Sequence, residues 1–182
     1  FSSVVPVLLM VSSREPLAEP WQLALLFVGL LLLNDAWFYL VHRLLHTPWL
    51  FKRVHSVHHR SIAVNPFTSY SFHPIEGLAL TLWVVPVLLF VPVPLPLLGA
   101  LQVLGLLNNV NAHLGYELFP RWFVRVPPFK WLTSSTFHNL HHASVVGNYG
   151  LMLRVWDRAF GTERADYEER FSRRLPETTT GG

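Results

Sequence analysis

Cysteine is absent from this 182-residue chain, and charged side chains are scarce. Without cysteine, the chain forms no disulfides, thiolate zinc sites or iron–sulfur clusters, so a redox metal needs nitrogen or oxygen ligands. Only 14% of the residues are charged, well below the usual fraction in soluble domains. The sequence also lacks a G-x-G-x-x-G dinucleotide fingerprint and any nucleic-acid-binding motif. This profile indicates an integral membrane protein rather than a soluble enzyme.

Apolar residues make up 51% of the chain and gather in long runs. Residues 21–41 are long enough to cross a bilayer core. Residues 77–91 and 97–112 form two shorter runs, and the intervening prolines at 92–96 should end a helix and force a turn. We therefore predict an all-α integral membrane helical bundle in which this pair forms a hairpin. The length suits a single domain over residues 1–182.

The charge pattern predicts an orientation, because basic residues flank the apolar runs on one side and the proline turn carries no charge. These residues are Arg43, Lys52, Arg53, Arg60, Arg121, Arg125 and Lys130. By the positive-inside rule their side is cytoplasmic. The predicted path leaves the membrane at residue 41, re-enters at 77, turns at 92–96 and returns by 113. The mixed aromatic and basic segment 119–132 fits the lipid headgroup layer; the alternative is a loop that covers the soluble part.

Two terminal segments carry separate expectations. We interpret residues 1–13 as the remnant of a spanning helix. The alternative is the remnant of a signal peptide, although neither a basic region nor a small-residue cleavage site is visible. Residues 176–182 are expected to be a disordered polar tail.

Histidine is the most informative residue type, because eight of the ten histidines lie in the boxes HRLLH, HSVHH and HNLHH. Spacings of three and four residues place imidazoles on one face of a helix. The two HxxHH boxes are separated by 78 residues, and each can supply ligands to two neighbouring metals. Imidazole binds zinc, copper, iron and nickel, but this many histidines exceeds one zinc site and suits two metals. Two redox metals beside a membrane favour iron and oxygen activation.

Further polar candidates surround the boxes. Asp35 and Tyr39 share a helical face with the first box, and a carboxylate within an apolar segment usually has a functional partner. We predict that Asp35 orients a ligating imidazole, and we place Asp35 and Tyr39 in the catalytic machinery. The alternative for Asp35 is snorkelling, or pairing with Arg43.

Three more residues lie near the other ends of the apolar runs. His113 lies at the inner end of the predicted returning helix, with Asn109 one turn earlier. An ionisable side chain at membrane depth is usually functional, so His113 is a candidate site residue. His73 lies near Glu76 and precedes a proline, so it is a metal ligand, a partner that orients a ligand, or a helix-start residue. We regard His73, Glu76 and Asn109 as candidate ligands or ligand-orienting residues.

These motifs resemble the fatty acid hydroxylase/sterol desaturase superfamily. The similarity includes Asp35 and all three boxes, and it covers roughly residues 35–162. HHRSIAVNPFTSYSFHPIEG and NYGLMLRVWDRAFGT resemble the sterol C5-desaturase branch. Carried over by position, the resemblance implies as metal ligands His42, His46, His55, His58, His59, His113, His138, His141 and His142.

The resemblance also implies a fold and an activity. It predicts about four spanning helices, the first truncated here, with a cytoplasmic histidine-rich helical cap that binds two non-haem irons. Such enzymes use dioxygen and two external electrons to hydroxylate or desaturate an aliphatic C–H bond of a lipid or sterol. The electrons would come from a separate donor of the cytochrome b5 or ferredoxin type. Alternatives from other classes are a bis-histidine haem electron-transfer protein and a metal transporter or zinc-dependent membrane hydrolase.

Overall fold

The computed structural model describes residues 19–61 and 64–174, and within them the chain is helical. Extended pairing there consists of an isolated bridge between Leu132 and Leu153. The expectations for residues 1–13 and 176–182 concern segments outside the described residues. The helices, including π and 3-10 turns labelled η, are α2 (Pro20–Leu45), α3 (Pro48–Leu50), η1 (Phe51–His55), α4 (Ser56–His59), η2 (Pro66–Tyr70), α5 (Pro74–Thr81), α6 (Val84–Phe90), α7 (Leu95–Ala112), η3 (Phe129–Trp131), α8 (Ser135–Ser144), α9 (Val155–Ala159) and α10 (Tyr167–Arg174).

Two helices, α2 and α7, are long and apolar enough to cross a membrane. A core helix of a soluble protein passes the same test, but it is mostly buried. Here the apolar windows of α2 and α7 are only 17% and 6% buried. Their outward faces carry large apolar side chains such as Leu32, Leu40 and Leu107. Such exposed apolar surface is typical of membrane spans, so α2 and α7, which cover the apolar runs at 21–41 and 97–112, are candidate membrane spans.

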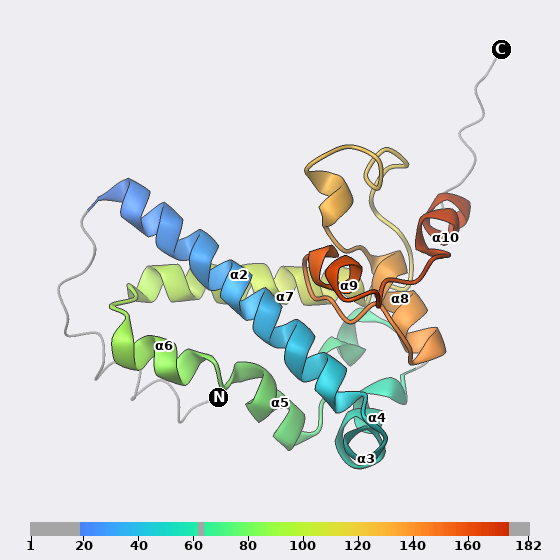
Figure 1. Ribbon diagram of the computed structural model, residues 1–182, viewed down its shortest axis with the longest axis horizontal. Helices are drawn as coiled ribbons and strands as arrows, with labels where there is room; N and C mark the ends of the chain where they lie inside the picture. The colour runs from blue at the N-terminus through green and yellow to red at the C-terminus, as the bar shows by residue number, and fades with distance from the viewer. Residues whose placement is uncertain (1–18, 62–63, 175–182) are drawn as a thin grey trace.

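The apolar run at 77–91 was expected to be continuous, but the structure divides it into α5 and α6 around Leu82 and Trp83. The ring of Pro86 explains the break, because a proline inside a helix clashes with the carbonyl four residues earlier, here that of Leu82. The predicted proline turn is confirmed: α6 ends at Phe90, and Pro94 caps the start of α7. The resulting hairpin packs against α2 (Figure 1).

Apolar packing holds this hairpin to α2. Leu30 from α2 forms a buried cluster with Val87, Leu88 and Val93 of the hairpin. In addition, the Trp37 indole donates a hydrogen bond to the Ala79 carbonyl at 2.9 Å, between α2 and α5.

Residues 119–174, which include α8, α9 and α10, gather at one end of the long helices and form what we call the cap (Figure 1). Its core contains Phe123, Phe137 and Tyr167, among other buried residues. The segment 119–132 divides accordingly: Phe123 packs in this core, whereas Trp122 and Phe129 are exposed. Part of the segment thus covers the cap, and a headgroup position for its exposed aromatic side chains stays a prediction.

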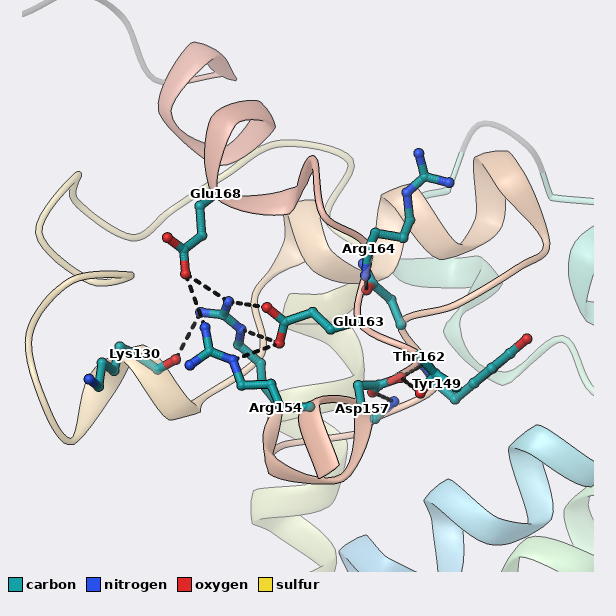
Figure 2. A network of polar contacts seen from close by, with 11 residues as sticks. Lys130, Tyr149, Arg154, Asp157, Thr162, Glu163, Arg164 and Glu168 are labelled. Atoms are coloured by element: carbon teal, nitrogen blue, oxygen red, sulfur yellow. Dashed lines mark hydrogen bonds and ion pairs between the residues drawn. The ribbon is translucent and has the colours of Figure 1, made fainter. Parts of the chain in front are cut away.

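A fully buried arginine ties the cap together. The Arg154 guanidinium pairs with Glu163 at 2.6 Å and with Glu168 at 3.0 Å. It also donates to the Lys130 carbonyl at 2.8 Å and lies 4.4 Å from the centre of the Tyr167 ring. Figure 2 shows Lys130, Glu163 and Glu168 converging on Arg154 from separate segments of the cap. A single side chain therefore cross-links the cap.

We expect Arg154→Ala to destabilise the cap by about 3 kcal/mol, because it removes a fully buried guanidinium together with its hydrogen bonds to Lys130, Glu163 and Glu168. Thermal unfolding of the purified protein in detergent measures the loss. Arg173→Ala is a matched control, since Arg173 forms an exposed ion pair with Glu169. The control should change the free energy of unfolding by no more than about 0.5 kcal/mol. Equal losses in both variants would contradict the role given to Arg154.

Candidate metal centre

Nine of the histidines converge in two groups. The five-histidine group consists of His42, His46, His55, His59 and His141, and the four-histidine group of His58, His113, His138 and His142. Within each group the nearest ring nitrogens all lie within 4.8 Å of one another. Every one of these side chains is buried except His46, which is partly buried. The structure therefore brings together the nine histidines that the sequence singled out.

Helical geometry explains how two similar boxes serve both groups. In HSVHH, which runs from η1 into α4, the first and last histidines join the five-histidine group and His58 joins the other. In HNLHH on α8 the assignment is reversed, because His138 and His142 join the four-histidine group and His141 joins the five. Residues four apart lie on one side of a helix, and the third lies beside them. Each box thus contributes to two adjacent sites.

The membrane helices complete the groups from the other direction. His42 lies in the last turn of α2, and His46 is the C-cap of that helix. His113 is the C-cap of α7. The ends of both candidate spans therefore point histidines at the boxes carried by α4 and α8. The rings of His59 and His142, from different groups, stack with centroids 4.6 Å apart, so the two groups are immediate neighbours.

Backbone carbonyls fix the tautomers of several rings. The Nδ1 of His42 donates to the Tyr149 carbonyl at 2.8 Å, and that of His141 to the Gly147 carbonyl at 2.7 Å. In the four-histidine group, His113 Nδ1 donates to the Asn109 carbonyl at 2.8 Å. A carbonyl oxygen only accepts, so the proton is on Nδ1 and Nε2 presents a lone pair. These rings are oriented with their lone pairs toward the centres of the groups.

The Nε2 atoms are close enough to share a cation. His141 Nε2 lies 3.1 Å from the Nε2 atoms of both His46 and His59. His138 Nε2 lies 3.1 Å from those of both His113 and His142. One lone pair accepts one well-aligned proton, so hydrogen bonding among imidazoles cannot satisfy contacts that converge in this way. A metal ion at the centre of each group satisfies all of them together.

The protonation states agree with ligation. Burial, followed by repulsion from neighbouring imidazoles, lowers the pKa of His59 to about 3. The same causes lower the pKa of His142 to about 3 and hold that of His138 well below its usual value. These rings are therefore neutral at neutral pH, which is the form that binds metals.

The donor set restricts the metal. It is built of imidazole nitrogen, which suits zinc, copper, iron and nickel. Sets of five and four nitrogens exceed the three protein ligands typical of catalytic zinc. The buried Glu76 does not join either set within the described residues. Its Oε1 instead lies 2.8 Å from His55 Nδ1, where it orients that ring.

Two further candidates have roles beside the groups. His73 caps α5, where its Nδ1 accepts a hydrogen bond from the Ile75 amide at 3.2 Å. Of the interpretations left open for His73, the structure thus supports the helix start. Asn109 orients His113 through its backbone carbonyl, while its side chain donates to the Ser69 carbonyl at 2.7 Å.

The expectation that Asp35 orients an imidazole was wrong. Its Oδ1 accepts from the Met152 amide at 2.7 Å, and its Oδ2 accepts from the Trp156 indole at 2.8 Å. Asp35 therefore joins α2 to the cap. The alternative for Asp35 was a pair with Arg43. Among the described residues, Arg43 instead donates a hydrogen bond to the Tyr39 hydroxyl.

Tyr39 joins α2 to the cap. Its hydroxyl lies 3.0 Å from Thr162 Oγ1, and its ring stacks on Phe160. Tyr39 is fully buried in this joint, and a catalytic role for it stays a prediction.

Sequence reasoning missed the loop 147–150, which supplies two of the orienting carbonyls. Every residue has a backbone carbonyl, so residue type does not reveal which carbonyls orient ligands. The two glycines of this loop do signal a close approach of the backbone. Gly147 has a φ of +79°, and a Cβ there would lie 2.7 Å from the Thr162 carbonyl oxygen. A Cβ at Gly150 would lie 2.6 Å from the Leu153 carbonyl oxygen. Glycine is required at both positions for the backbone to approach so closely.

Several known proteins are similar to this chain in sequence. Methylsterol monooxygenase 1 of Gallus gallus is 32% identical over 136 residues, which is 74% of this chain and 45% of the relative. The corresponding protein of Rattus norvegicus is 34% identical over 137 residues, 75% of this chain and 45% of the relative. Very-long-chain aldehyde decarbonylase GL1-6 of Oryza sativa subsp. indica is 35% identical over 146 residues, 76% of this chain and 23% of the relative. The chain therefore spans less than half the length of each of these relatives.

No solved structure matches the chain significantly. The family profile described as fatty acid hydroxylase matches residues 27–162, a range that includes both histidine groups and the loop 147–150. Because this match covers most of the chain, the protein belongs to the fatty acid hydroxylase family, within the fatty acid hydroxylase/sterol desaturase superfamily that its histidine boxes resemble.

Proposed function

We propose that this protein is a membrane-bound non-haem di-iron oxygenase that hydroxylates or desaturates an aliphatic C–H bond of a lipid or sterol. The observation that carries the proposal is the pair of adjacent histidine groups at the ends of two apolar helices. The nine histidines would hold two irons, one in each group. Bound iron would supply the reduction of dioxygen and the oxidising power needed to break an unactivated C–H bond.

The chain's own residues prepare the site. Glu76 and the carbonyls of residues 109, 147 and 149 hold four ligand rings in fixed tautomers. Burial keeps the imidazoles neutral and excludes water, which limits side reactions of a strong oxidant. The reaction consumes dioxygen, two electrons and two protons. It yields an alcohol and one water, or an alkene and two waters.

A lipid substrate fits the position of the groups. The helices α2, α5, α6 and α7 expose apolar side chains, and both α2 and α7 end at the histidine groups. A substrate dissolved in the bilayer could therefore reach the irons without entering water. The relatives named for methylsterols and very-long-chain aldehydes support a lipid of this general class.

The two electrons require an external donor of the cytochrome b5 or ferredoxin type, because the sequence carries no dinucleotide fingerprint. We further propose a multi-pass topology with the cap on the cytoplasmic side, where such donors act. The basic residues that flank the apolar runs support this orientation.

The alternatives explain the geometry less well. A haem with two axial histidines needs their nitrogens on opposite sides of a porphyrin, whereas here four or five rings crowd around one point. A transporter needs a polar path through the bilayer, but Asn108 and Asn109 use their side chains to bind the carbonyls of Leu151 and Ser69.

The first prediction about function concerns metal content. Protein purified without added metal should contain about two irons per chain, without the Soret absorption of haem. His46→Ala should weaken iron binding at the five-histidine group, and His142→Ala should weaken it at the four-histidine group. Each variant should therefore contain fewer than two irons but at least about one, because its other group is intact. Elemental analysis by mass spectrometry measures the count.

His73→Ala is the matched control for these substitutions. It removes a histidine that caps a helix, so it should keep about two irons while losing about 1 kcal/mol of stability. A loss of iron in this control, or full retention in His46→Ala and His142→Ala, would refute the ligand assignment.

The second prediction concerns the reaction. With ferrous iron, a reducing partner and isotopically labelled dioxygen, the protein in lipid vesicles should oxidise one of two test lipids, a methylsterol or a very-long-chain aldehyde. Mass spectrometry should find label in an alcohol product, or an alkene with label in water. His142→Ala and His58→Ala should each abolish the product while leaving the protein in the membrane. Product from either variant at the wild-type rate would contradict the mechanism.

A further inference from the structure

One peptide group links a buried carboxylate to a ligand of the five-histidine group. The carbonyl of Tyr149 accepts a hydrogen bond from His42 Nδ1 at 2.8 Å. The amide of Gly150, which belongs to the same peptide group, donates to Asp157 Oδ2 at 2.7 Å. Asp157 and His42 therefore contact the two opposite ends of one peptide dipole.

Asp157 is firmly held in this position. Its Oδ1 accepts from the Tyr149 amide at 2.9 Å and from Thr162 Oγ1 at 2.7 Å. The side chain is fully buried. Figure 2 shows Asp157 directed at Tyr149 and Thr162, separate from the ion pairs of Arg154. Its acceptor groups are thus committed to the loop 147–150 and to the turn that leads to residue 162.

The neighbouring peptide repeats the pattern with a backbone acceptor. The Gly147 carbonyl accepts from His141 Nδ1 at 2.7 Å, and the Asn148 amide of the same peptide donates to the Thr162 carbonyl at 2.9 Å. His42 and His141 both belong to the five-histidine group. The loop therefore turns two carbonyls toward that group and the corresponding amides toward residues 157–162.

Such a chain of hydrogen bonds has an electronic consequence. An acceptor with negative charge at the amide polarises the peptide, which makes its carbonyl a stronger acceptor. A stronger acceptor at Nδ1 fixes the ring orientation and raises the basicity of the ligating Nε2. In many metal sites a carboxylate contacts the histidine directly, as Glu76 contacts His55 here. Asp157 would act in the same sense through a peptide.

We propose that Asp157 is a positioning residue for the five-histidine group, where it orients His42 and strengthens it as a metal ligand through the Tyr149–Gly150 peptide. The four-histidine group does not depend on it, because His113 is oriented by the Asn109 carbonyl of α7. This inference rests on the proposed metal-binding function.

Cobalt(II) binding to the full chain tests the proposal without any turnover. Detergent-purified protein is stripped with a chelator and titrated with cobalt(II), whose visible bands report ligand geometry. His42→Ala identifies the bands of the five-histidine group, and His138→Ala those of the four-histidine group. Asp157→Asn should weaken binding at the five-histidine group by roughly 10–100-fold and shift its bands. The bands and affinity of the four-histidine group should stay as in the wild type.

Asp35→Asn is the matched control. Asp35 is equally buried and also accepts hydrogen bonds from backbone amides of the same segment, Met152 and Leu153. The carbonyl that shares a peptide with the Met152 amide, that of Leu151, accepts from Thr133 and Asn108 instead of an imidazole. Asp35→Asn should therefore lower the unfolding temperature but leave cobalt affinity at both groups unchanged.

Three outcomes would overturn the proposal. They are unchanged cobalt binding in Asp157→Asn, an equal loss at both groups, and an equal loss in Asp35→Asn. If Asp157→Asn does not fold, Asp157→Glu retains the charge but moves the oxygens, and wild-type bands in that variant would likewise overturn it. A wild-type chain that binds no cobalt would refute the proposed metal site as well, so the two failures are distinguishable.

Discussion

The convergence of buried, neutral imidazoles is the constraint on which the rest of this structure depends. Burying a polar nitrogen without a partner is costly, and here eight rings are buried and a ninth is partly buried, with their nitrogens facing one another. Rings in such a site must be held against rotation and mutual repulsion before a metal arrives. The scaffold provides this through fixed acceptors at Nδ1, such as Glu76 for His55 and the Gly147 carbonyl for His141. The arrangement of α2, α4, α7 and α8 follows from that requirement.

The site lies at the junction of two unlike parts of the molecule. The long helices expose apolar side chains, whereas the cap has its own aromatic core and ion pairs (Figure 1). Each group takes ligands from both parts, for example His42 from α2 and His141 from α8. Asp35 fastens α2 to the cap at Met152 and Trp156. Two separate sets of contacts therefore hold this junction: the shared histidines and the polar contacts of Asp35.

What could be predicted from sequence was the local geometry. The spacing within HSVHH and HNLHH fixes which histidines share a helical face, and that rule holds without knowledge of the fold. The proline turn before α7 was also predictable, because a proline ends a helix through its own local geometry. The division between α5 and α6 was also present in the sequence, at Pro86, but the apolar run was interpreted as continuous.

Contacts across long sequence distances were not predictable. Asp35 was expected to serve an imidazole, yet its acceptor atoms bind an amide and an indole more than a hundred residues away. Backbone amides and carbonyls are present at every residue, so no sequence pattern marks the ones that a carboxylate will bind. For the same reason the sequence did not predict the role of the loop 147–150, where the carbonyls of Gly147 and Tyr149 orient His141 and His42.

The two histidine groups have unequal support, which bears on how two metals would differ. In the five-histidine group, three rings are anchored at Nδ1: His55 by a carboxylate, and His42 and His141 by carbonyls of one loop. In the four-histidine group, the Asn109 carbonyl of α7 anchors His113. Anchored, more basic ligands favour the higher charge state of a metal. The first group therefore has the stronger means to stabilise an oxidised ion.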